Sequence, residues 1–131
     1  MTHKWEASRF KNPIARAEGL GSLKSGFDHW WMQRVTACSN IFLMIWAIWS
    51  VLTLTGADYT TFITWLAMPC HAILLSLFII STFIHAALGL QIVIEDYVHT
   101  ELTKVISLIA LRLFFTALAV AALFSILKIA V

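Results

Sequence analysis

The chain has 131 residues, of which 60% are hydrophobic and 12% are charged, and its formal net charge at pH 7 is +2. This apolar composition excludes an ordinary water-soluble domain and indicates a membrane protein. The small positive charge does not indicate a nucleic-acid partner, and the spacing of Cys38 and Cys70 does not indicate a metal site.

Residues 1–28 are polar and include Pro13 and several glycines, so we expect a surface arm with at most short helical pieces. The arm is expected to lie against a partner or the membrane face. Because the first long apolar run begins only at Val35, we expect no cleavable signal peptide. Residues 29–131 are expected to form the membrane anchor.

The first membrane span is predicted at about residues 33–55. Trp30 and Trp31, followed by Arg34, are typical of an interfacial aromatic belt with a cationic anchor just before a span. From Val35 to Thr55 the chain carries no charge, and this run is long enough for one transmembrane helix of about 20 residues.

The second span is predicted at about residues 69–95. The chain from Tyr59 to Ile94 also carries no formal charge, but as one straight helix it would be longer than a bilayer is thick. Proline is disfavoured inside a helix and favoured in its first turn, so the helix should begin near Pro69. Residues 59–68 are then expected to be interfacial.

The third span is predicted at about residues 105–129, with Arg112 and Lys128 near enough to its ends for their side chains to reach the interface. Most Lys and Arg residues precede the first span, and Lys104 lies between the second and third. The positive-inside rule therefore places the amino terminus in the cytoplasm and the carboxyl terminus outside. We thus predict an all-α membrane protein with three transmembrane helices.

His85 lies in the second predicted span, ten residues before Glu95, the next charged residue. At a rise of 1.5 Å per residue its imidazole lies roughly 15 Å below the surface, near mid-bilayer. An ionisable group at that depth usually has a function, such as haem ligation; a hydrogen bond to a neighbouring helix is the alternative. Gly89, one turn further on, would leave clearance for a flat macrocycle, although glycine is also common where membrane helices pack closely.

His71 lies 14 residues before His85 on a similar helix face, so the two could hold two haems in a dihaem membrane cytochrome. The other two spans contain no histidine, so we favour an interfacial role for His71 near Pro69. For a haem on His85, Met44 is the only other ligand of this chain at a matching depth. A histidine from a partner subunit is preferred, because packing explains Met44.

Asp96 and Tyr97 follow His85 at the predicted inner end of the same span. A quinone takes up protons as well as electrons when it is reduced, and a phenol beside a carboxylate can donate a hydrogen bond and exchange protons. Arg34, predicted at the same membrane face, could orient a propionate, a quinone carbonyl or Asp96 through its guanidinium. A solvated loop with an aromatic anchor is the alternative.

The pattern HAALGLQIVIEDYVH, which runs from His85 to His99, resembles the small hydrophobic membrane anchor of bacterial succinate dehydrogenase (respiratory complex II). The stretch GSLKSGFDHWWMQRVTACSN is similar to the entry to the first helix in alphaproteobacterial and mitochondrial-type members. The resemblance implies an anchor that pairs with a second, cytochrome b556-type anchor subunit. The two would share one haem b and dock an iron–sulfur and a flavoprotein subunit on the inner side.

By the same resemblance, His85 matches the axial ligand of the haem iron, and Tyr97 with Asp96 beside it matches the ubiquinone site. Arg34 resembles the first-helix arginine near the haem propionates. The implied function is the membrane anchor of succinate:ubiquinone oxidoreductase in the bacterial inner membrane, a subunit that is not catalytic by itself. A fumarate reductase anchor, a dihaem cytochrome and a purely structural anchor are the alternatives.

Overall fold

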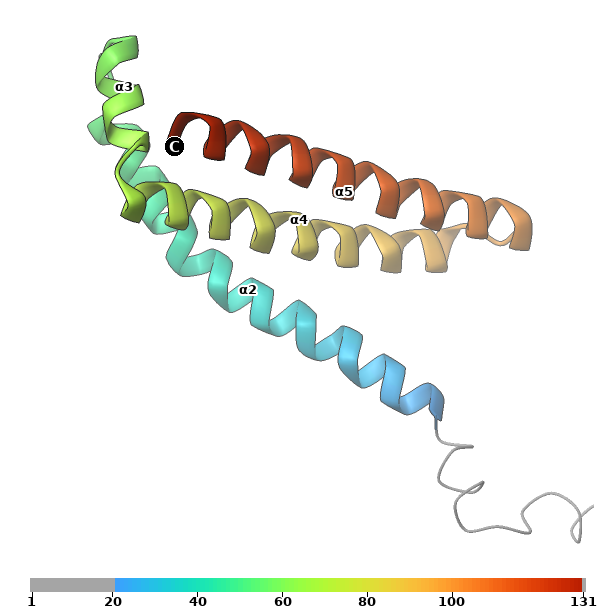
Figure 1. Cartoon of the computed structure of the whole chain (residues 1–131). Coiled ribbons are helices and arrows are strands. Elements are labelled where there is room, and N and C mark those ends of the chain that lie inside the picture. Colours follow the sequence, from blue (N-terminus) through green and yellow to red (C-terminus); the bar gives the residue numbers. More distant parts are fainter. Residues whose placement is uncertain (1–20, 131) are drawn as a thin grey trace, which may run out of the picture. The chain divides into compact units, whose positions relative to one another are not determined.

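The computed structural model describes residues 21–130, with side chains from Gly26 onward, and within this part the chain is helical and contains no strand. Figure 1 shows its four helices. They are α2 (Gly21–Thr53), α3 (Tyr59–Leu66), α4 (Pro69–Tyr97) and α5 (Glu101–Ala130). Residues 1–20 of the expected polar arm lie outside the described residues.

Three of the helices are long and apolar enough to cross a membrane, namely Gly26–Thr53, Pro69–Tyr97 and Glu101–Ala130. The prediction of an all-α protein with three transmembrane helices is therefore confirmed. The first helix begins earlier than the expected span, because α2 already includes residues 21–32. Hydropathy finds only the uncharged, apolar part of a helix, and residues 21–32 include Lys24 and Asp28.

The chain divides into two compact units, residues 1–32 and residues 33–131. In the first unit, the aromatic rings of Phe27, Trp30 and Trp31 lie with their centroids 6.0 to 6.4 Å apart. All packing described below belongs to the second unit.

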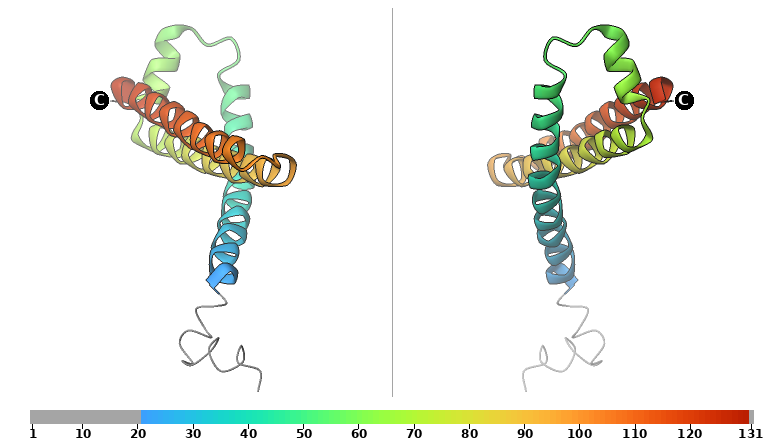
Figure 2. Two further views of the ribbon diagram at one scale, coloured as in Figure 1. Left: turned by 90° about the vertical axis from the view of Figure 1, so that its right-hand side faces the viewer. Right: turned by 90° about the vertical axis from the view of Figure 1, so that its left-hand side faces the viewer.

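Helices α4 and α5 are antiparallel neighbours, joined by residues 98–100, and lie side by side in Figures 1 and 2. The ring of Phe83 meets that of Phe115 edge-on at a centroid distance of 5.8 Å. The buried apolar core is small and consists of Leu66, Ala72 and Ile126, where α3 meets the start of α4 and the end of α5. Most large apolar side chains are exposed, as expected where lipid or partner helices cover them.

Local chemistry defines the corner between α2 and α4. Gly56 takes a φ of +80°, a left-handed conformation that favours glycine, and so turns the chain after α2. Asp58 then caps α3: its carboxylate accepts hydrogen bonds from the Thr60 hydroxyl (2.6 Å) and the Thr61 amide (3.0 Å). These bonds, led by that from Thr60, lower the pKa of Asp58 to about 2. Pro69 begins α4 in the first-turn position that proline favours.

Candidate functional site

His85 lies on α4 and contacts Thr36 on α2. The two side chains are joined by a hydrogen bond of 3.0 Å between the imidazole Nδ1 and the threonine Oγ1. Thr36 is only 6% exposed, and His85 is partly buried. The hydrogen bond to a neighbouring helix, the alternative to haem ligation for His85, is therefore present, and it occupies one of the two ring nitrogens.

The proton arrangement follows from a second hydrogen bond. The Thr36 hydroxyl donates to the backbone carbonyl of Gln33 at 3.2 Å. A hydroxyl has a single proton, so once that proton is donated to Gln33 the oxygen can only accept from His85. Nδ1 is then the protonated nitrogen, and Nε2 keeps its lone pair. A neutral imidazole with an available Nε2 is the form that binds metals.

Further polar contacts join α2 and α4 around this pair. The Ser81 hydroxyl donates to the backbone carbonyl of Thr36 at 3.4 Å, and the Thr82 hydroxyl donates to the Asn40 side-chain oxygen at 3.5 Å. Small and polar residues at such a contact are typical of packed membrane helices. Both contacts are long for hydrogen bonds, and they lie beside the His85–Thr36 pair without touching the imidazole.

Gly89 lies one turn after His85 and is not required by the packing of α2. A Cβ added there would meet Gln33 Nε2 at 3.7 Å, an ordinary van der Waals contact. Close helix packing, the alternative explanation for this glycine, therefore receives no support from the contacts present. Gln33 also carries the buried side-chain oxygen Oε1, which has no hydrogen-bond partner in the described part of the chain.

No group of three or more His, Cys, Asp or Glu side chains that could enclose a metal ion occurs within residues 21–130. A metal cage built by this chain alone is therefore absent from that region. A haem iron is different, because the macrocycle supplies most of its ligands and the protein supplies only axial ones. The single imidazole of His85 is compatible with that kind of site.

Asp96 and Tyr97 form the last turn of α4, and Tyr97 is 78% exposed. Next to them, the Gln91 amide donates to the Glu95 carboxylate at 2.8 Å, and His99 Nδ1 lies 3.0 Å from the Tyr97 carbonyl. The phenol and the Asp96 carboxylate are thus accessible at the end of the helix. Their expected role at a quinone stays a prediction.

Arg34 is exposed on α2, just before Thr36. Its expected place beside a propionate, a quinone or Asp96 also stays a prediction.

Thr36, which contacts His85, could not be picked out from the sequence as a site residue. The available signal was the set of polar residues Thr36, Ser39 and Asn40 in an otherwise apolar span, but the sequence does not say which of them faces a histidine.

His71 has partners of a different kind. Its Nδ1 lies 2.9 Å from the carbonyl oxygen of Trp65, and because a carbonyl only accepts, Nδ1 is the donor. The imidazole stacks on the Trp65 ring at a centroid distance of 4.2 Å, and the ring of Trp46 lies 6.4 Å away. Packing at the corner of α3 and α4 thus accounts for His71.

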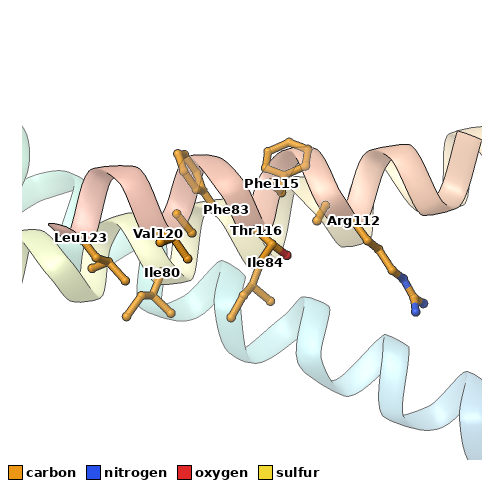
Figure 3. A pocket seen from close by; sticks show the side chains of 10 residues that line it. Ile80, Phe83, Ile84, Arg112, Phe115, Thr116, Val120 and Leu123 are labelled. Carbon is orange, nitrogen blue, oxygen red and sulfur yellow. The ribbon is translucent and has the colours of Figure 1, made fainter. Parts of the chain in front are cut away.

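An open groove of about 380 Å³ lies between α4 and α5 (Figure 3). It is lined by apolar side chains, with Arg112 and Leu123 at opposite ends. Because α5 begins at Glu101, Arg112 lies roughly 16 Å along the helix rather than the roughly 10 Å expected from a start at residue 105. This arginine is therefore further from the helix end than the sequence suggested.

Comparison with known proteins gives concordant results. The profile of the family described as succinate dehydrogenase/fumarate reductase transmembrane subunit matches residues 8–125. The succinate dehydrogenase hydrophobic membrane anchor subunit of Rickettsia bellii is 35% identical over 105 residues, which are 80% of this chain and 84% of the relative.

Two further relatives come from other organisms. The succinate dehydrogenase membrane anchor subunit of Reclinomonas americana is 30% identical over 92 residues, covering 68% of this chain and 77% of its own. The corresponding hydrophobic membrane anchor subunit of Paracoccus denitrificans is 30% identical over 89 residues, which are 68% of this chain and 69% of the relative. No solved structure gives a significant match to the chain.

Proposed function

This chain belongs to the succinate dehydrogenase/fumarate reductase transmembrane subunit family, and from that premise we propose that it is the hydrophobic membrane anchor of a succinate:ubiquinone oxidoreductase. It contributes an axial ligand for a haem b and part of the ubiquinone-reduction site. Succinate is oxidised in a flavoprotein subunit, and the electrons reach the membrane through an iron–sulfur subunit. The chain is therefore not an enzyme by itself.

The environment of His85 is the observation that carries the haem proposal. A histidine near the middle of a membrane helix needs a reason to be there, because ionisable groups at that depth are unfavourable. Its Nδ1 is held at 3.0 Å by the buried hydroxyl of Thr36, which leaves Nε2 with a lone pair. Metal-bound histidines usually have their second ring nitrogen bonded in this way.

The residues around His85 are compatible with a haem. Gly89 presents no side chain one turn below the imidazole, and only Gln33 Nε2 comes within 4 Å of the place a Cβ would take. A bound haem b would supply a one-electron carrier partway across the membrane. The second axial ligand is proposed to come from a histidine of the second anchor subunit, because packing against lipid or neighbouring helices explains Met44, which is 48% exposed.

The quinone part of the proposal is supported by the end of α4. Tyr97 offers an O–H donor to a quinone carbonyl, and Asp96 beside it can exchange protons with water. Their exposure in the single chain leaves room for a ligand and for neighbouring subunits. Arg34 is proposed to orient the quinone or a haem propionate from α2.

The subunit is proposed to lie in the bacterial inner membrane with its amino terminus in the cytoplasm. The excess of Lys and Arg before the uncharged part of α2, which begins at Val35, supports that orientation. It places the end of α4 on the cytoplasmic side, where the iron–sulfur and flavoprotein subunits would dock. Succinate oxidation is preferred over fumarate reduction as the physiological direction, since the relatives above are named as succinate dehydrogenase subunits.

Purification of the native complex through an affinity tag on this chain tests the proposed function. Mass spectrometry is expected to find a flavoprotein, an iron–sulfur subunit and a second anchor subunit, and optical spectroscopy is expected to find one haem b per complex. Two haems per complex would favour the dihaem cytochrome. Co-purification without any flavoprotein would contradict the anchor function.

A further inference from the structure

We infer that Thr36 is the positioning residue for His85: it fixes the tautomer and the ring orientation that present Nε2 to the haem iron. This inference rests on the proposed function of His85 as a haem ligand. It assigns Thr36 a role through its contact with His85.

The geometry around Thr36 is a chain of hydrogen bonds with a definite direction. His85 Nδ1–H donates to the Thr36 hydroxyl at 3.0 Å, and that hydroxyl donates to the Gln33 carbonyl at 3.2 Å. The carbonyl of Gln33 can only accept, so the chain cannot run the other way without losing that bond. With the Thr36 hydroxyl donating to Gln33, the protonated nitrogen of His85 is Nδ1 and Nε2 carries the lone pair.

Thr36 is also held firmly in place. It is 6% exposed, which excludes water as a ready substitute for its hydroxyl. Ser81, one turn before His85 on α4, donates to the backbone carbonyl of Thr36 at 3.4 Å. Two side chains of α4 thus contact one residue of α2.

Loss of the Thr36–His85 hydrogen bond is expected to change both the affinity for haem and the reduction potential of the haem. A hydrogen bond accepted from Nδ1–H makes the imidazole a better electron donor, and its loss typically lowers metal affinity about 10- to 100-fold. A stronger donor favours ferric over ferrous iron. Losing the bond should therefore raise the reduction potential of the haem, and a tenfold change in the relative affinity for the two oxidation states corresponds to about 59 mV.

The test uses the complete complex with Thr36→Val, which keeps the shape of the side chain and removes the hydroxyl. Haem content after extensive washing and the haem midpoint potential are measured, together with the electron paramagnetic resonance spectrum of the ferric haem. We expect weaker retention of haem, a higher potential and an altered spectrum. Thr36→Ser keeps a hydroxyl and is expected to restore all three.

Thr82→Val is the matched control. Thr82 makes a similar polar contact between α4 and α2, to Asn40 at 3.5 Å, but does not contact His85. This variant is expected to leave the potential and the spectrum unchanged. Equal shifts in Thr36→Val and Thr82→Val would show a general packing effect and would overturn the inference, as would a wild-type potential in Thr36→Val.

If the Thr36→Val complex does not assemble, the Thr36→Ser complex tests the inference alone. A haem midpoint potential in Thr36→Ser that differs from the wild-type value would contradict it. Failure of the proposed function gives a different result. In that case the wild-type complex holds no haem, or His85→Ala retains it, whatever the Thr36 variants do.

Discussion

His85 and His71 lie on the same helix, and the groups bonded to their Nδ1 atoms differ in kind. His85 bonds to a buried hydroxyl that is itself a donor to the backbone, and its Nε2 has no assigned partner among the described residues. His71 bonds to the Trp65 carbonyl and stacks on the indole of the same residue. An Nδ1 bond of either kind leaves Nε2 available to a metal, so the bond alone does not distinguish the two histidines. His85 is the proposed ligand because it is predicted to lie near the middle of the membrane, whereas stacking on Trp65 accounts for His71.

The role of Tyr97 is tested by removing only its hydroxyl. Tyr97→Phe is expected to lower ubiquinone reduction roughly tenfold, the effect of losing about 1.4 kcal/mol of hydrogen bonding to the substrate. Succinate oxidation with a soluble artificial dye should stay near the wild-type rate. Tyr59→Phe is the matched control, because Tyr59 and Tyr97 are both 78% exposed and Tyr59 lies on α3. Equal losses in the quinone and dye assays would indicate a structural role for Tyr97.

At the scale of the element, helix α4 carries both the proposed haem ligand and the proposed quinone-site residues. His85 lies eleven residues before Asp96, so the haem ligand and the quinone residues are separated by roughly 16 to 18 Å along the helix axis. The start of α4 at Pro69 and the three apolar helices could be predicted from the sequence, because proline and long uncharged runs have strong local effects. The pairing of Thr36 with His85 could not, since it depends on how two helices are rotated against each other.

The stability of the short helix α3 is predicted to depend on pH. The carboxylate of Asp58 caps α3, and the hydrogen bonds from Thr60 and Thr61 lower its pKa to about 2 from its usual value of 3.8. Because the pKa is lowered in the folded state, the cap stabilises α3 fully above about pH 4. That stabilisation is lost as the pH falls through 2.

Amide hydrogen exchange at Thr61 is the measurement for this prediction. Protection of the amide is expected to decrease in acid for the wild type, after correction for the intrinsic exchange rate. Asp58→Asn still accepts a hydrogen bond but cannot titrate, so its protection should not change over the same range. Protection that is independent of pH in the wild type would show that Asp58 does not cap the helix in solution.

At the scale of the whole chain, its apolar surface is the dominant feature. Among the residues whose side chains are described, the buried apolar core consists of Leu66, Ala72 and Ile126, while Phe42 and Trp49 are 74% and 67% exposed. Membrane helices gain stability from close packing with other helices, and this chain provides little of it alone. Lipid and partner subunits are therefore expected to cover these faces.

The proposed orientation is tested by cysteine labelling in intact inner-membrane vesicles, after Cys38 and Cys70 have been replaced by serine. Thr100→Cys, between α4 and α5, should react with an impermeant maleimide only from the cytoplasmic side. Asp58→Cys, between α2 and α3, should react only from the opposite side. The reverse pattern would place the amino terminus outside and move the Asp96 and Tyr97 pair away from the cytoplasm.

The most direct test of haem ligation by His85 is the optical spectrum of the purified complex carrying His85→Ala. The dithionite-reduced spectrum of this variant is expected to lack low-spin haem b, because the lost imidazole is the proposed axial ligand. His71→Ala is the matched control on the same helix and should retain the haem at the wild-type ratio. A His85→Ala complex that keeps a normal low-spin haem spectrum would contradict the assignment of His85 as the haem ligand.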